Sequence, residues 1–159
     1  MHLYMIELAQ KRGFHFDTVQ MPINVMDAHF RSFNKLVCPA ADKAGIGVIA
    51  MKSMGAGVIL KSKTASPEEC LRYTLSQPAS VVVTGINSQA VLDQAFGVAK
   101  SFKPMTASEI SALLGRTAKA ADRGEFELFK TSAHFDGTAN HPEWMGGETS
   151  KVKALGGSA

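Results

Sequence analysis

Three short apolar runs alternate with longer amphipathic segments along most of the chain. The runs cover residues 16–21, 46–51 and 80–85, and their starts lie 30 and 34 residues apart. Each run is too short for a helix and contains β-branched residues, so each predicts a strand. Helix-length segments between successive strands favour βαβ units with parallel pairing.

The segments around these runs have the periodicity and end signals of helices. The first, at the amino end of the chain, closes with a cationic turn followed by Gly13. Ser66 with Glu69 and Thr106 with Glu109 have the spacing of capping boxes, which mark helix starts. The expected helices cover residues 3–9, 30–44 with an interruption at Pro39, 67–77 and 110–123.

Composition limits the classes of function. Hydrophobic residues make up 45% of the chain and charged residues 19%, with a net charge of +3, which is typical of a globular protein. Charges of both signs alternate, so we expect no nucleic-acid binding. No signal peptide or membrane span is expected, and Cys38 and Cys70 are isolated in apolar contexts. These features predict buried thiols in a cytoplasmic protein that carries no metal.

Candidate chemistry follows each predicted strand. Gln20 ends the first run and offers an amide that can recognise a carboxamide, although a polar strand end is the alternative. Gly55 and Gly57 follow the second run and would let backbone N–H groups approach a pyrophosphate, unless they form a plain turn. Ser88 follows the third run, where a simple helix cap is the alternative to a phosphate site. All three positions fall where a barrel of parallel strands binds its ligand.

The residues that form these runs resemble consecutive blocks of bacterial aldo/keto reductases. The similar blocks are residues 16–24, 45–55, 66–73 and 83–88, in the order of strands six to eight of that family's barrel, and the resemblance covers about residues 3–130. It implies an α/β fold that is the C-terminal half of a (β/α)8 TIM barrel, with parallel strands, an extra C-terminal helix and an irregular tail. We expect a partial barrel over residues 1–130 and an irregular tail over 131–159, with about the last ten residues disordered.

The resemblance also implies NADPH-dependent carbonyl reduction. Gln20 would bind the nicotinamide carboxamide, and Met51 would lie beneath the ring. Residues 53–57 would line the pyrophosphate, while Asn87 and Ser88 would meet the adenosine ribose and its 2′-phosphate. The implied cofactor-binding residues are Gln20, Met51, Lys52, Ser53, Met54, Gly55, Gly57, Gly85, Asn87, Ser88 and, facing adenine, Gln94.

Two positions depart from the family's pattern. Val91 stands where many members place an Arg for the 2′-phosphate, and Ala95 stands where many place an Asn for adenine. NADH is therefore a possible cofactor beside NADPH.

The family's catalytic Asp, Tyr, Lys and His come from its first four strands and their loops, and we expect this chain to lack them. Tyr4 and Tyr73 are expected to pack within helices, and His134, Asp136 and His141 have no spacing typical of a metal site. By itself the chain is therefore expected not to reduce a small carbonyl substrate. The alternatives are a half-barrel module completed by self-association or by a separate N-terminal half, and a free-standing α/β domain that binds another phosphate compound.

Overall fold

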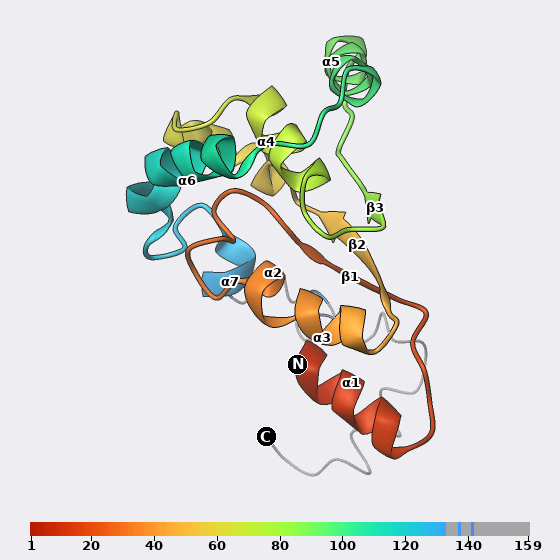
Figure 1. Ribbon diagram of the computed structural model, residues 1–159. Coiled ribbons are helices and arrows are strands. Elements are labelled where there is room, and N and C mark those ends of the chain that lie inside the picture. Colours follow the sequence, from red (N-terminus) through yellow and green to blue (C-terminus); the bar gives the residue numbers. More distant parts are fainter. Residues whose placement is uncertain (133–136, 138–140, 142–159) are drawn as a thin grey trace. The chain divides into compact units, whose positions relative to one another are not determined.

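The protein has a mixed α/β fold built on three parallel strands (Figure 1). The computed structural model describes residues 1–132, Gly137 and His141. The chain divides into two units, Met1–Glu127 and Leu128–Ala159. In the second unit the described helix is α7, Leu128–Thr131. Most of the predicted irregular tail, including its last ten residues, lies outside the described residues.

The three strands pair side by side in the order in which they occur along the chain. β1 spans Thr18–Pro22, β2 spans Gly47–Met51 and β3 spans Val81–Val82. Both pairings are parallel, with Met21 opposite Ala50 and Ala50 opposite Val82. The prediction of three parallel strands joined by helical segments is confirmed.

The third strand is much shorter than the predicted run over residues 80–85. β2 ends at Met51, and Lys52 then adopts a left-handed φ of +57°, which turns the chain away from the sheet. The last bond to this edge runs from the Val83 N–H to the Ala50 carbonyl, at 2.8 Å. Residues beyond Val83 have no strand beside them in the described sheet, so they form a loop.

The predicted helices are present with shifted ends, and the two capping boxes are confirmed. The segment predicted to start a helix at residue 30 becomes helical only at Phe33, because Arg31 has a left-handed φ of +44° and Ser32 caps the helix that follows. The α-helices of the first unit are α1 His2–Lys11, α2 Phe33–Leu36, α3 Cys38–Lys43, α4 Pro67–Leu75, α5 Gln89–Lys100 and α6 Ala107–Ala121. Two 3₁₀ turns, η1 Gly55–Gly57 and η2 Ile59–Ser62, lie between β2 and α4.

Helices cover one face of the sheet and leave the other open. On the covered face Met21, Val48 and Ala50 pack with Ile6 of α1 and Ala41 of α3 in one buried cluster. The alternate residues of each strand point to the opposite face, where no buried hydrophobic cluster forms in the described structure. We call this the open face: Thr18, Gln20, Ile49, Met51, Val81 and Val83, all half-buried or exposed.

A buried polar network holds the segment between β1 and α2. The Asn24 side-chain oxygen accepts hydrogen bonds from the N–H groups of Met26 and Asp27, each at 2.8 Å, and its amide donates to Glu127 at 3.1 Å. Asp27 accepts from the N–H groups of Phe33 and Asn34 at the start of α2. Because buried polar groups are costly when unpaired, these bonds fix where β1 ends and α2 begins.

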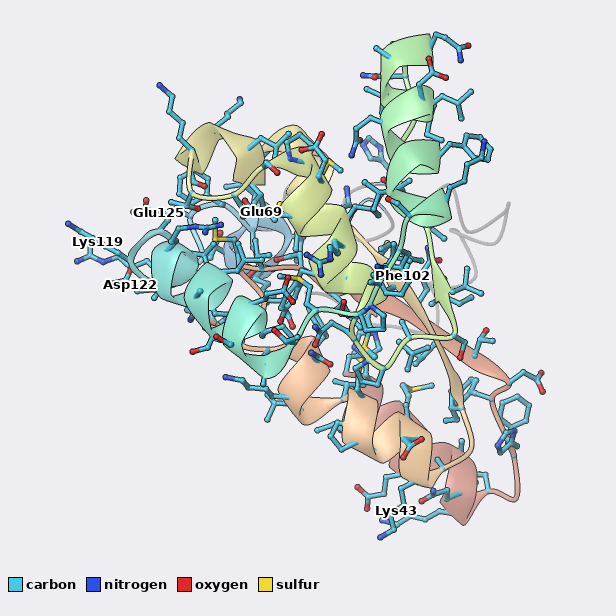
Figure 2. The ribbon with its side chains drawn as sticks, turned by 45° about the horizontal axis from the view of Figure 1, so that its top comes forward. Lys43, Glu69, Phe102, Lys119, Asp122 and Glu125 are labelled. Atoms are coloured by element: carbon cyan, nitrogen blue, oxygen red, sulfur yellow. The ribbon has the colours of Figure 1, made fainter. Side chains whose placement is uncertain are left out.

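An ion pair joins α4 to α6. Glu69, labelled on α4 in Figure 2, accepts a hydrogen bond from the Ser66 N–H at 2.9 Å and pairs with Arg116 of α6. Partial burial opposes ionisation of Glu69, but the Ser66 N–H and the Arg116 guanidinium outweigh it and hold the pKa of this carboxyl below its ordinary value.

Glu69→Gln should therefore lower the free energy of unfolding near pH 7 by about 1 kcal/mol or less, since the pair is partly exposed to solvent. A carboxyl with a lowered folded-state pKa stabilises the protein above its unfolded pKa, and the contribution is lost as pH falls through the folded value. The difference from wild type should thus shrink below about pH 4.5. Thermal melts from pH 3 to pH 7 measure it, with the exposed neighbour substitution Glu68→Gln as control. A pH-independent difference, or the same loss with Glu68→Gln, would contradict the assignment.

Candidate functional site

A cleft of about 570 Å³ lies at the carboxyl ends of the strands, which is a volume typical of small-molecule sites. Eight of the eleven candidate residues line it: Gln20, Met51, Lys52, Ser53, Met54, Gly57, Gly85 and Asn87. They come from β1, from the end of β2 and the segment that follows it, and from the loop after β3. The structure therefore brings together residues up to 67 positions apart, from Gln20 to Asn87.

The segment after β2 forms one wall of the cleft through a left-handed turn. Gly55, Ala56 and Gly57 have φ values of +56°, +57° and +83°. The Gly57 N–H donates to the Met54 carbonyl at 2.8 Å, which closes the turn. A Cβ added to Gly57 would meet no atom within 4 Å. The backbone at Gly57 is therefore open to a ligand that comes close to it.

Gly55 does not line the cleft with the other residues of its turn. A Cβ at this position would lie 2.9 Å from Ile59 Cγ1, closer than real Cβ contacts allow. Gly55 is buried and is not among the residues that line the cleft. Packing against Ile59 and the positive φ are each sufficient reason for a glycine at this position.

The loop after β3 and the start of α5 form the opposite wall. Gly85 has open space where a Cβ would stand, and Asn87 and Val91 line the cleft. Ser88 caps α5 by accepting a hydrogen bond from the Val91 N–H at 3.3 Å, and it does not line the cleft. The N–H groups and dipole of a helix amino terminus favour an anion, so this rim of the cleft is suited to a phosphate.

Gln94 lies apart from the other candidate residues. It lines a separate groove between α4, α5 and α6, and its amide nitrogen is buried without a hydrogen-bond partner in the described structure. Val91, three residues earlier on α5, lines the cleft, whereas the Gln94 side chain lines the groove towards α4 and α6. The expected adenine contact is therefore not assembled with the rest of the cleft.

Three cleft residues had no role in the sequence-based prediction: Val83, Thr84 and Ile86. Ala56 also lines the cleft and falls within the predicted segment 53–57. The first three were assigned to the third strand or to its end. They face the cleft because β3 stops early and leaves them in a loop.

No acid, imidazole or phenol is among the residues that line the cleft. Tyr73 is buried, as predicted, and burial raises its pKa to about 12. The prediction that Tyr4 packs within the fold is wrong, because it is 61% exposed on α1. Cys38 and Cys70 are free and buried, as predicted, and burial raises their pKa values to about 11 and about 12. Both remain neutral thiols at physiological pH.

The cleft thus offers glycine backbone, a helix amino terminus, the amides of Gln20 and Asn87, the Lys52 ammonium group, two hydroxyl groups and apolar surface. No group of three or more His, Cys, Asp or Glu side chains within the described ranges could hold a metal ion. In the same ranges, no helix has the length and apolar character needed to cross a membrane. No protein-family model and no curated protein matches this chain.

Ala56→Gly should stabilise the protein. An alanine at a φ of +57° is strained by its Cβ, and glycine removes that strain at the cost of a more flexible unfolded chain. We expect a net gain of about 0.5–1 kcal/mol in urea unfolding. Ala112→Gly, on the exposed side of α6, should instead lose about 1 kcal/mol. A loss with Ala56→Gly as large as that with Ala112→Gly would show that the left-handed turn does not strain this position.

Proposed function

We propose that the first unit of this protein binds a nicotinamide dinucleotide as the cofactor-binding part of an aldo/keto reductase-like (β/α)8 barrel. One observation carries the proposal. Eight of the cofactor-binding residues implied by the resemblance line a single cleft at the carboxyl ends of parallel strands. Ligands of such barrels bind at this end, and loops after the last two strands often form the phosphate site.

The two walls of the cleft are suited to bind a pyrophosphate between them. Gly57 on one wall and Gly85 on the other leave open space where side chains would stand, so the backbone can come close to phosphate oxygens. The amino terminus of α5, which spans 12 residues, favours negative charge at the same rim. Both features suit a ligand with phosphate groups.

Gln20 and Met51 support a nicotinamide at the inner end of the cleft. They lie on β1 and β2 at the open face, where Gln20 is opposite Ile49 and Met51 follows two residues later on the same face. The Gln20 amide can donate and accept in one plane, as a carboxamide requires. Met51 supplies a polarizable apolar surface for the ring.

The proposal assigns binding and orientation to this chain, not proton transfer. A bound NADPH or NADH supplies a hydride for reduction of a small carbonyl substrate. Among the residues that line the cleft, Lys52 carries an ammonium group that could give up a proton, and none is a carboxylic acid, an imidazole or a phenol. The proposal assigns Lys52 to cofactor binding, so the proton donor would come from whatever covers the open face. Val91 brings no positive charge to a 2′-phosphate, so NADH is retained beside NADPH.

The position of Gln94 favours one second candidate, a domain that binds a smaller phosphate compound. Without the Gln94 contact in the cleft, the glycine walls and the α5 amino terminus remain, and neither is specific for an adenine dinucleotide. This candidate keeps the phosphate site and drops the nicotinamide assignment.

Calorimetric titration of the 159-residue chain with NADPH, NADH and inorganic phosphate separates these functions. Gly57→Ala should weaken dinucleotide binding about tenfold or more, because its methyl group enters the open space beside the cleft. Gly13→Ala is the matched control, since Gly13 also has a positive φ and open space but lies at the end of α1. Both variants should lose about 1 kcal/mol of stability, and only the first should lose affinity.

Binding of phosphate alone, with no added affinity from the nicotinamide and adenosine parts, would favour the second candidate. Absence of dinucleotide binding, or equal loss of affinity in the two glycine variants, would contradict the proposed function.

A further inference from the structure

A groove of about 580 Å³ lies between α4, α5 and α6, and its volume is within the range of small-molecule sites. In the described part of the chain, the groove and the cleft at the strand ends share no lining residue. Apolar surface comes from Val98 of α5, Leu113 of α6 and, between these helices, Met105 and Phe102, which is labelled in Figure 2. The groove is therefore a second candidate site, formed by side chains that the cleft does not use.

Hydrogen bonds and ion pairs hold the wall of the groove that α4 and α6 form. The Arg72 Nε group donates to the Lys103 carbonyl at 3.1 Å, and the same guanidinium pairs with Glu109 at 2.9 Å. Arg116 of α6 pairs with Glu69 of α4. Because these side chains are already fixed by one another, little order has to be imposed on this wall when a ligand binds.

The amide of Gln94 gives the groove a hydrogen-bond donor without a partner. Its nitrogen is buried and makes no hydrogen bond in the described structure, and the side chain lines the groove. A buried donor that stays unpaired destabilises a protein, which is why most such groups are paired. The last torsion of a glutamine side chain is only weakly restrained, so a rotation can turn this amide towards a ligand. The groove thus favours a ligand with an acceptor oxygen at this point.

The charges around the groove favour a cation. Three carboxylates and two guanidinium groups line it, which gives one net negative charge although the whole chain carries +3. Both guanidinium groups are paired with carboxylates, whereas Glu68 makes no ion pair within the described ranges. Glu68 is exposed at the start of α4. An ammonium group of a ligand can therefore reach this carboxylate and gain from its charge.

We propose that this groove binds a small organic amine that carries an apolar body and a carbonyl oxygen. The ammonium group pairs with Glu68, the apolar body packs against Phe102 and Leu113, and the carbonyl oxygen accepts a hydrogen bond from the Gln94 amide. The inference does not rest on the proposed function, because the groove and the cleft are lined by different residues.

NMR titration of the 159-residue chain with L-phenylalaninamide tests the proposal, because this probe has an ammonium group, a carbonyl oxygen and an apolar ring. We expect saturable shifts at millimolar probe in the amides of the groove, with none in the cleft. N-acetyl-L-phenylalanine keeps the ring but carries a negative charge, and glycinamide lacks the ring. Each should bind about tenfold more weakly or worse. No saturable shifts with L-phenylalaninamide, or equal affinity for N-acetyl-L-phenylalanine, would overturn the proposal.

Gln94→Leu separates recognition of the ligand from a structural role of this side chain. It should weaken binding of L-phenylalaninamide about tenfold, because the donor to the carbonyl oxygen is lost. It should not lower the melting temperature, because an unpaired buried donor is removed. Gln89→Leu is the matched control on the same helix, since Gln89 is exposed and donates to Asp93 at 2.8 Å outside the groove. Unchanged affinity in Gln94→Leu, or the same loss in Gln89→Leu, would overturn the proposal.

Glu68→Gln tests the position of the ammonium group. It should weaken binding of L-phenylalaninamide about fivefold and reduce the dependence of that binding on salt, since one exposed charge pair is lost. No ion pair of the described structure is broken by this change, so the fold should be unaffected. Equal affinity of Glu68→Gln and wild type would count decisively against the assigned ligand.

Discussion

The structure depends on a parallel sheet that has hydrophobic cover on one face only. Met21, Val48 and Ala50 point to the covered face and pack against α1 and α3, which holds the three strands in register. Burial of Met21 and Val48 contributes roughly 1.5–3 kcal/mol each, and this burial sets which face carries helices. The residues that alternate with them along each strand point to the open face. This alternation is the reason that Gln20 and Met51 reach the cleft, because both belong to the uncovered set.

Much of the fold could be predicted because its signals are local. Runs of β-branched residues marked the strands, and Ser66 with Glu69 marked the start of α4 through a pattern of four residues. The ends were harder, since they depend on neighbours. β3 stops at Val82 because β2 stops at Met51, and α2 starts at Phe33 because Asp27 and Ser32 bind its first N–H groups. The end of β3 and the start of α2 are therefore both set by contacts between separate segments.

The candidate site divides in the same way, into residues that local sequence patterns predict and residues whose placement depends on contacts between segments. Gln20 of β1 and Asn87 of the loop after β3 both line the cleft, because parallel strands bring their carboxyl ends to one edge of the sheet. Gly55 was placed with them by its spacing from Gly57 and by the resemblance, and Gln94 by the resemblance alone. In the structure Gly55 packs against Ile59, and Gln94 lines the groove between α4, α5 and α6. Ser88 acts as a cap beside the cleft. Sequence position could not separate a glycine beside open space, such as Gly57, from one that packs against a side chain.

The central claim is that the two walls of the cleft bind a nicotinamide dinucleotide. Amide chemical shifts recorded by NMR during titration with NADPH test it most directly. The account predicts saturable shifts in residues 52–57 and 83–88 and in Gln20, with little change in α1 and α3, which pack on the covered face. Shifts confined to the groove between α4, α5 and α6, or no shifts at all, would contradict it.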